Sequence, residues 1–384
     1  MSQRPTLRRS RIWCSRLGEE YVSRVGFGAR LTVLGSLNMD ISVTVPRLPA
    51  PGATVLGGAA AYAPGGKGAN QAVAAARLGG RVRMVGCVGD DDFGARLRAA
   101  LQAEGVESSG VRAIPGVPSG LAMITVDETG ENIITVAPGA NREVGAAEVA
   151  AAGAAPADVL VISAEIPVAA IKAALAAEGE GQGTPPVRIL NLAPAPPQAS
   201  ELVACGVDWL VVNESEAAAV LGRPVAGLAG AARAAADLVA AGARNAVVTA
   251  GAAGAAYCGA GSQASRDGTR PGAGAGPGPA DGSAVSGDGA VAGPGDGKHP
   301  GAKTPGAMTV PGFPVRAVDS VGAGDTFVGA LAVALAGGVP PPDAVVAAAA
   351  AGAAAATKPG TQSGMPHPAD VMAATGHRWP VTVP

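Results

Sequence analysis

The chain has 384 residues, enough for one large domain or two modest ones, and 48% hydrophobic against 15% charged residues excludes a wholly disordered protein. A net charge of −2 and only 3% aromatic residues argue against a basic or base-stacking surface for nucleic acid. No apolar run reaches the ~18 residues of a membrane span, and four widely separated cysteines predict reduced thiols and a cytoplasmic location.

Along the chain, residues 1–30 carry seven arginines and no apolar stretch, so we expect a disordered tail there and one domain over 31–384. From Leu31 onward, apolar runs of strand length alternate with alanine-rich helical stretches, which predicts a parallel sheet covered on both faces. The runs that we interpret as strands are 31–35, 82–88, 121–126, 133–136, 159–162, 187–192, 209–212 and 246–249.

Three segments break this alternation. Two more polar β segments, at about 41–64 and 112–137, predict a small sheet set apart from the main one. Residues 258–307 are rich in glycine and proline and lack leucine, isoleucine and phenylalanine, so they cannot bury enough apolar surface to offset the entropy of ordering. We interpret them as a disordered insertion in a surface loop.

The strongest local signal is a glycine-rich turn that leads into an apolar helix at Asp319–Phe327. The backbone amides of Gly322, Ala323 and Gly324 would lie at the positive end of the helix dipole, which favours phosphate oxygens. Asp325 in the first turn is poorly suited to bind an anion but well suited to accept a proton from an attacking hydroxyl. A helix-capping aspartate behind an ordinary glycine turn remains the alternative.

Three weaker motifs also combine glycine turns or strand ends with polar side chains. Residues 64–71 form a second glycine loop before a helix, in which Lys67 and Asn70 add donors. Asn38 and Asp40 follow the first strand and can face one way to bond vicinal hydroxyls, although turn chemistry would also explain them. Residues 213–216 follow another strand and could surround a hydrated Mg²⁺ or simply cap a helix.

Taken together and in order, these motifs resemble the ribokinase-like members of the PfkB carbohydrate kinase family. The resemblance runs from about Leu31 to Pro366 and is carried by six segments. They are GSLNMD (35–40), GGKGANQAVAAARLG (65–79), GDDDFG (89–94), NLAPA (191–195), NESE (213–216) and AVDSVGAGDTF (317–327). It implies a three-layer α/β/α sandwich with a central, mostly parallel sheet and a small β-sheet lid, which in the family also pairs two subunits into a homodimer.

The same resemblance implies ATP-dependent phosphorylation of the 5-hydroxyl of D-ribose, with Asp325 as the base and an anion hole at Gly322, Ala323 and Gly324. Sugar-binding residues carried over from the family are Asn38, Asp40, Gly66, Lys67, Gly68, Asn70 and Glu165. Nucleotide-binding residues are Asn213, Thr249, Gly251, Gly254 and Gly324. Glu216 would hold Mg²⁺ through water, and a monovalent cation, K⁺, would lie at Asp319, Val321, Ala355, Lys358 and Gly360.

The chain departs from the family pattern mainly on the nucleotide side, at Ala252–Ala253, Val328, Ala348 and Gly364. These departures bear on nucleotide affinity and cation dependence more than on sugar chemistry. Two alternatives stay open from sequence: a PfkB kinase for another small sugar or a nucleoside, and a sugar-binding regulator without catalysis.

Overall fold

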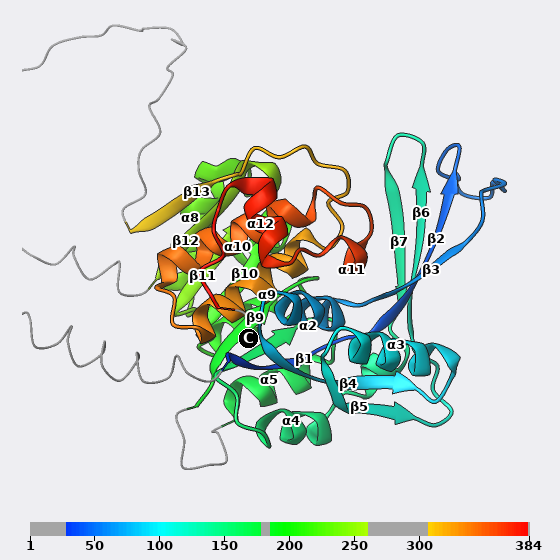
Figure 1. Cartoon of the computed structure of the whole chain (residues 1–384), viewed down its shortest axis with the longest axis horizontal. Helices are drawn as coiled ribbons and strands as arrows, with labels where there is room; N and C mark the ends of the chain where they lie inside the picture. Colours follow the sequence, from blue (N-terminus) through cyan, green and yellow to red (C-terminus); the bar gives the residue numbers. More distant parts are fainter. Residues whose placement is uncertain (1–27, 178–184, 260–305, 383–384) are drawn as a thin grey trace, which may run out of the picture.

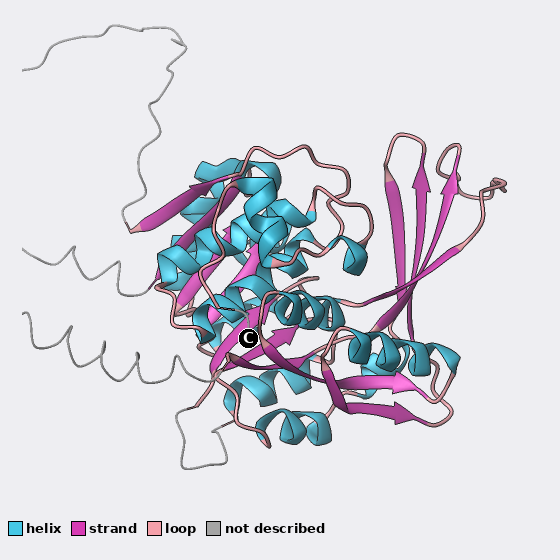
Figure 2. Cartoon of the chain, viewed as in Figure 1, coloured by secondary structure: helices cyan, strands magenta, loops and turns pink. Residues whose placement is uncertain are grey.

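The main sheet of the computed structural model has nine strands, in the order β13-β12-β11-β10-β9-β8-β1-β4-β5, within the described residues 28–177, 185–259 and 306–382. Seven of these strands run parallel, and β12 and β13 extend one edge antiparallel to their neighbours (Figures 1 and 2). The strands are β1 (Arg30–Leu34), β4 (Arg81–Gly89), β5 (Glu107–Ile114), β8 (Val159–Ser163), β9 (Val187–Asn191), β10 (Trp209–Asn213), β11 (Asn245–Thr249), β12 (Gly254–Gly259) and β13 (Ala307–Pro311).

Helices cover both faces of this sheet, because its strands are apolar on both sides. Val33 and Val211 belong to one buried cluster, whereas the next residues, Leu34 and Val212, belong to the other. The helices on the face of Val33 and Val211 are α2 (Lys67–Arg77), α3 (Asp92–Ala103), α9 (Ala323–Ala336), α10 (Pro341–Ala355) and α12 (Pro368–Thr375). The helices on the face of Leu34 and Val212 are α4 (Ala146–Gly153), α5 (Val168–Ala176), α6 (Ala199–Ala204), α7 (Glu214–Leu221) and α8 (Gly227–Ala240). The short helices are η1 (Gly139–Glu143), η2 (Gly251–Ala253) and α11 (Thr361–Gly364). The predicted three-layer sandwich is confirmed.

A second sheet of four strands projects from the main body (Figure 1). Its order is β3-β2-β6-β7, from β2 (Asn38–Val45), β3 (Ala61–Gly65), β6 (Gly120–Asp127) and β7 (Asn132–Ala137). This sheet is the predicted lid, with changed boundaries: the segment 112–137 divides, because β5 continues to Ile114 and pairs with β4 in the main sheet. Val111 and Ile114 are buried there, which ties this part of the segment to the core.

The predicted ends of the tail and of the insertion also need correction. Ala29 is buried and Arg30 already pairs in β1, so the ordered domain begins before Leu31. Cys258 pairs with Ala307 across β12 and β13, so both ends of the segment 258–307 belong to the sheet. The predictions of disorder for residues 1–27 and 260–305 lie outside the described residues. In the part of the chain that is described, no helix is both long and apolar enough to cross a bilayer.

Candidate active site

Polar residues gather where the parallel strands of the main sheet end. Glu165 follows β8, and Asn191, Asn213 and Thr249 are the last residues of β9, β10 and β11. Ser36 follows β1 in the same way. Open α/β sheets bind ligands beyond these carboxyl ends, so this edge is the candidate site.

Asp325 lies in the first turn of α9 and is 8% exposed. Its two carboxylate oxygens accept one side-chain amide each: Oδ2 from Asn70 Nδ2 at 2.9 Å and Oδ1 from Gln71 Nε2 at 3.1 Å. Gly322 precedes the helix with a φ of 80°, a left-handed conformation that favours glycine. Apart from its chain neighbours and the backbone of α9 itself, no heavy atom of the described residues lies within 4 Å of a Cβ built on Gly324. There is therefore open space beside Gly324, next to Asp325 in the first turn.

The predicted anion hole is only partly available in this structure, because the Ala323 N–H donates to the Ser320 carbonyl at 3.2 Å. The remaining first-turn amides have the helix-terminal position in which N–H groups lack an intrahelical acceptor.

Glu165 joins the first strand to the glycine loop of α2. Its Oε2 accepts from Ser36 Oγ at 2.6 Å, from the Lys67 backbone N–H at 3.3 Å and from Asn38 Nδ2 at 3.5 Å. Asn38 Oδ1 in turn accepts from Asn141 Nδ2 at 2.7 Å. Two predicted sugar-binding residues, Asn38 of β2 through its side chain and Lys67 of α2 through its backbone, thus meet at the carboxylate of a third, Glu165.

The ionisable groups of this edge influence one another. Burial raises the pKa of Asp40 to about 7, and the carboxylates of Glu165 and Asp325 add to the shift. The carboxylate of Asp325 contributes most to raising the pKa of Lys67 above its usual value, against the effect of burial. Burial also raises the pKa of Glu216, although its hydrogen bond to the Asn213 backbone and the charge of Lys67 act in the opposite direction. These groups therefore form one electrostatically coupled site.

The glycine loop before α2 packs so closely that side chains would not fit. Gly66 precedes the helix with a φ of 88°. A Cβ on Gly68 would lie 2.7 Å from backbone atoms of Gly35, and one on Gly65 would lie 2.2 Å from Asp40 Oδ2. The start of α2 is held against the end of β1 and against the lid strand β2.

Asn213 and Glu216 form a capping box at the start of α7. Asn213 Oδ1 accepts from the Glu216 N–H at 2.9 Å, and Glu216 Oε2 accepts from the Asn213 N–H at 2.8 Å. The capping alternative left open from the sequence is thus realised, and any contact with a nucleotide or a hydrated ion comes in addition to it. Among the described residues, no group of three or more His, Cys, Asp and Glu side chains could hold a metal ion.

The turn after β11 carries the other predicted nucleotide residues. Thr249 Oγ1 lies 3.5 Å from the Val212 carbonyl, and Gly251 is exposed at the start of η2 with a φ of 52°. Gly254 has a φ of 113°, and a Cβ there would lie 2.0 Å from the Val310 carbonyl oxygen. Gly254 is thus required by the close approach of β13, whatever it contributes to a ligand.

The predicted cation residues lie on two loops that Asp319 joins. Its Oδ1 accepts from the Val321 N–H and its Oδ2 from the Gly360 N–H, both at 2.9 Å. Three backbone carbonyl oxygens come within 3.6 Å of the position that a Cβ on Gly364 would occupy. They belong to Lys358, Pro359 and Ala355. The Lys358 ammonium instead pairs with Asp370 at 2.8 Å, so Lys358 contributes only its backbone carbonyl to this group of three oxygens.

Sequence reasoning missed the side chains that hold the predicted residues in place. They are Ser36, Gln71, Asn141, Asn191 and Gln362, and each is buried and hydrogen-bonded to a site residue or to its neighbour. Ser36 and Gln71 lie inside the motifs GSLNMD and GGKGANQAVAAARLG, so the sequence could have identified them as residues of the site. Asn141 and Gln362 lie far from their partners in sequence, and only the fold brings them there.

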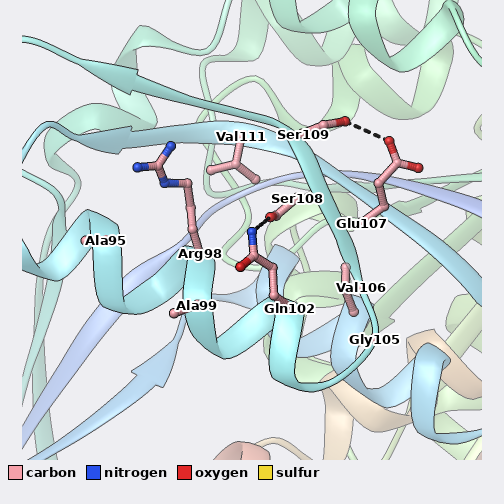
Figure 3. Close-up of a pocket in the computed structure, with 10 residues that line it drawn as sticks. All are labelled: Ala95, Arg98, Ala99, Gln102, Gly105, Val106, Glu107, Ser108, Ser109 and Val111. Atoms are coloured by element: carbon pink, nitrogen blue, oxygen red, sulfur yellow. Dashed lines mark hydrogen bonds between the residues drawn. The ribbon is translucent and has the colours of Figure 1, made fainter.

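A separate open groove of 820 Å³ lies between α3 and β5 (Figure 3). Arg98, Gln102, Glu107 and Ser108 line it, and Gln102 Nε2 donates to Ser108 Oγ at 3.0 Å. None of the predicted site residues lines this groove.

The pattern of the pfkB family of carbohydrate kinases matches residues 29–270 and 303–368. The chain belongs to this family. It is 33% identical to the ribokinase of Schizosaccharomyces pombe over 323 residues, which cover 81% of this chain and 86% of that protein. It is 38% identical to the ribokinase of Haemophilus influenzae, but that match spans only 63% of the relative. It is also 30% identical to the deoxyribokinase of Salmonella typhi, over 79% of this chain and 84% of that protein.

Solved structures agree with this assignment. The ribokinase of Thermotoga maritima superimposes with a TM-score of 0.67 and 28% identity, over 90% of this chain and 99% of that one. The ribokinase of Arabidopsis thaliana, solved with ribose and ATP, gives a TM-score of 0.67 and 26% identity, over 90% and 98% of the two chains. The ribokinase-like fold and membership of a sugar kinase family are thereby established, and the substrate is a separate question.

Proposed function

We propose that this protein is a ribokinase, which transfers the terminal phosphoryl group of ATP to the 5-hydroxyl of D-ribose and releases ADP and D-ribose 5-phosphate. One observation carries the proposal: the buried carboxylate of Asp325 adjoins both the open helix terminus at Gly324 and the amide of Asn70. A proton acceptor, an anion-binding terminus and a hydroxyl-binding side chain are the three parts that phosphoryl transfer to an alcohol requires.

In the proposed reaction, Asp325 accepts the proton of the sugar hydroxyl as its oxygen forms a bond to the γ-phosphorus. The bond between that phosphorus and the bridging oxygen of ADP breaks at the same time. The N–H groups of Gly322, Ala323 and Gly324 stabilise the charge on the transferring group. For Ala323 this requires its bond to Ser320 to open or to be shared.

Sugar binding is assigned to the residues around Glu165, namely Asn38, Asp40, Gly66, Lys67, Gly68, Asn70 and Glu165. The hydrogen bonds that Glu165 receives from Asn38 and from the Lys67 backbone support this set, because they place the donors and acceptors of three elements together. An ionised carboxylate accepts hydrogen bonds from hydroxyls and donates none, which suits a polyol with several vicinal hydroxyls.

ATP is assigned to the neighbouring strand ends, at Asn213, Thr249, Gly251, Gly254 and Gly324. Mg²⁺ is assigned beside Glu216, a carboxylate near enough to Asp325 for the two charges to influence each other, because a hydrated Mg²⁺ needs few protein ligands. The ion would neutralise charge on the phosphates. A monovalent cation, K⁺, is assigned to the loops joined by Asp319, on one of which the backbone carbonyls of Ala355 and Lys358 approach the same point beside Gly364. Val321 and Gly360 complete that assignment.

The four-stranded lid is assigned two roles: excluding water from the transfer and pairing two copies of the chain. Water would otherwise compete with the sugar as phosphoryl acceptor. Both faces of the lid expose apolar side chains, including Tyr62, Met123, Ile133, Ile134 and Val136. Exposed apolar surface on a small sheet of this kind favours association.

The test is an ATP-coupled assay over a panel of pentoses, hexoses and nucleosides, with and without K⁺. We expect ADP release with D-ribose, transfer to its 5-hydroxyl, and loss of turnover in Asp325→Asn. Turnover that survives in Asp325→Asn, or sugar binding without ADP release, would refute the proposed chemistry.

A second candidate substrate is 2-deoxy-D-ribose, because the match to the deoxyribokinase covers 79% of the chain, nearly as much as the 81% of the match to the Schizosaccharomyces pombe ribokinase. The same panel decides between them through the ratio of kcat/KM for the two sugars. Preference for the deoxy sugar would indicate that no side chain of the site uses the 2-hydroxyl.

A further inference from the structure

We propose that Gln71 is a positioning residue for phosphoryl transfer: its side-chain amide fixes the carboxylate of Asp325 from the side away from solvent. Gln71 is completely buried and lies in α2 directly after Asn70. It is too deep to contact a substrate and acts only through Asp325. The inference rests on the proposed function, since it assigns a role in the same reaction.

Both donor hydrogens of the Gln71 amide are used, whereas its Oε1 is buried and has no hydrogen-bond partner among the described residues. Nε2 carries two protons, and it donates to Asp325 Oδ1 at 3.1 Å and to Asn191 Oδ1 at 2.9 Å. The orientation of the amide is thereby fixed, because a flipped Gln71 would present its oxygen to two acceptors. Asn191 cannot flip either, since its Nδ2 donates to the Val211 carbonyl of β10 at 3.2 Å.

The contact therefore connects Asp325 to the central sheet. It runs from the backbone of β10 through Asn191 and Gln71 to the carboxylate. The backbone at Gln71 is also held, because α9 approaches it at Gly329: a Cβ there would lie 2.7 Å from the Gln71 carbonyl oxygen. Helix α9, which carries Asp325, is thus packed tightly against helix α2, which carries Gln71.

The other carboxylate oxygen has a different kind of partner. Asn70, which donates to Oδ2, is assigned to the sugar, and its own oxygen accepts from Gln362 Nε2 at 3.1 Å. Contacts of Asn70 must rearrange when a hydroxyl arrives, whereas Gln71 meets no ligand. Gln71 is the donor that can keep the carboxylate in place throughout the reaction.

Replacing Gln71 by methionine tests this role, because methionine has a similar length and no donor. We expect kcat to fall roughly 10- to 100-fold, while KM for the sugar and for ATP stays within about threefold of wild type. The matched control is Gln102→Met, which removes a glutamine donor to Ser108 in the groove of Figure 3 and should leave both constants unchanged.

A second measurement separates positioning from a structural effect. In an Asp325→Ala background no carboxylate remains to be held, so adding Gln71→Met should leave the residual rate unchanged. Thermal unfolding of each variant reports whether it folds. Should Gln71→Met not fold, Asn191→Ala keeps Gln71 but removes its second acceptor, and we expect a fall in kcat of roughly 3- to 10-fold.

Three results would overturn the inference: an unchanged kcat in folded Gln71→Met, a loss expressed in KM alone, or the same fractional loss with and without Asp325. For the fallback variant, the overturning result is a folded Asn191→Ala with wild-type kcat. Kinetics are measured with whichever sugar the wild-type protein phosphorylates. Undiminished turnover in Asp325→Ala would refute the proposed function itself, whereas an inactive Asp325→Ala beside a fully active Gln71→Met would refute only the role of Gln71.

Discussion

Replacing Asp40 by asparagine should stabilise the sugar-free protein above neutral pH and weaken its binding of sugar. Burial and two neighbouring carboxylates raise the pKa of Asp40 to about 7, from 3.8. The folded protein therefore favours the protonated form of Asp40. The protonated acid contributes its full share to the free energy of unfolding below about pH 4, and this contribution is lost as the pH rises towards 7. A shift of about three pH units at roughly 1.4 kcal/mol per unit corresponds to at most about 4 kcal/mol.

Urea unfolding of wild type and Asp40→Asn between pH 5 and 8, without sugar, measures this contribution. We expect the variant to gain stability relative to wild type as the pH rises, with the difference levelling off above about pH 7. Asp370→Asn is the control: pairing with Lys358 lowers the pKa of Asp370, so its stabilising effect is lost only at acid pH and the difference from wild type should be constant in this range. A constant difference for Asp40→Asn, or one that falls with pH, would refute the reasoning.

Three further outcomes follow from the contacts described above. Ser36→Ala removes the 2.6 Å hydrogen bond from the buried Ser36 to Glu165. We expect the free energy of unfolding in urea to fall by about 1–3 kcal/mol and KM for the sugar to rise. An unchanged KM would contradict the assignment of Glu165 to sugar binding. Deleting residues 260–305 leaves two glycines between the paired Cys258 and Ala307, a length that suits a hairpin turn. We therefore expect the deletion variant to be soluble and to turn over at the wild-type rate. Aggregation of this variant would show that the segment is needed. For the homodimer proposed above, Ile134→Glu should shift sedimentation from dimer to monomer, and a dimer that persists in the variant would exclude this lid position from the interface.

Much of the fold could be predicted because the strands are buried on both faces. Residues 159–162 and 209–212 are continuous apolar runs, and only a parallel sheet between two helical layers gives such runs a partner on each side. Residues 112–114 were misassigned to the lid because β5 is an edge strand. It mixes exposed and buried residues, so its sequence is more polar than the continuous apolar runs of the inner strands.

The candidate site could be predicted only as far as its motifs extended. Asp325, Lys67 and Asn70 stand beside glycine turns, so local chemistry identified them. Gln362 could not be predicted, because its bond to Asn70 joins residues 292 positions apart and depends on how α11 meets α2. The raised pKa of Asp40 likewise arises from its burial and then from the charges of Glu165 and Asp325, which come close to it only through the packing of separate elements.

The path of the chain between β1 and β2 has a mechanical consequence for the proposed enzyme. Asn38 and Asp40 are not part of the main sheet: they are the first and third residues of β2, the strand that continues outwards as the spine of the projecting sheet. If the four-stranded sheet moves relative to the core, it must therefore move two of the proposed sugar contacts, while Glu165 and Asp325 stay with the main sheet and its helices. Such a movement would separate the proposed sugar-binding groups from one another, so it would weaken the hold on a bound sugar at the same time as it exposes the site.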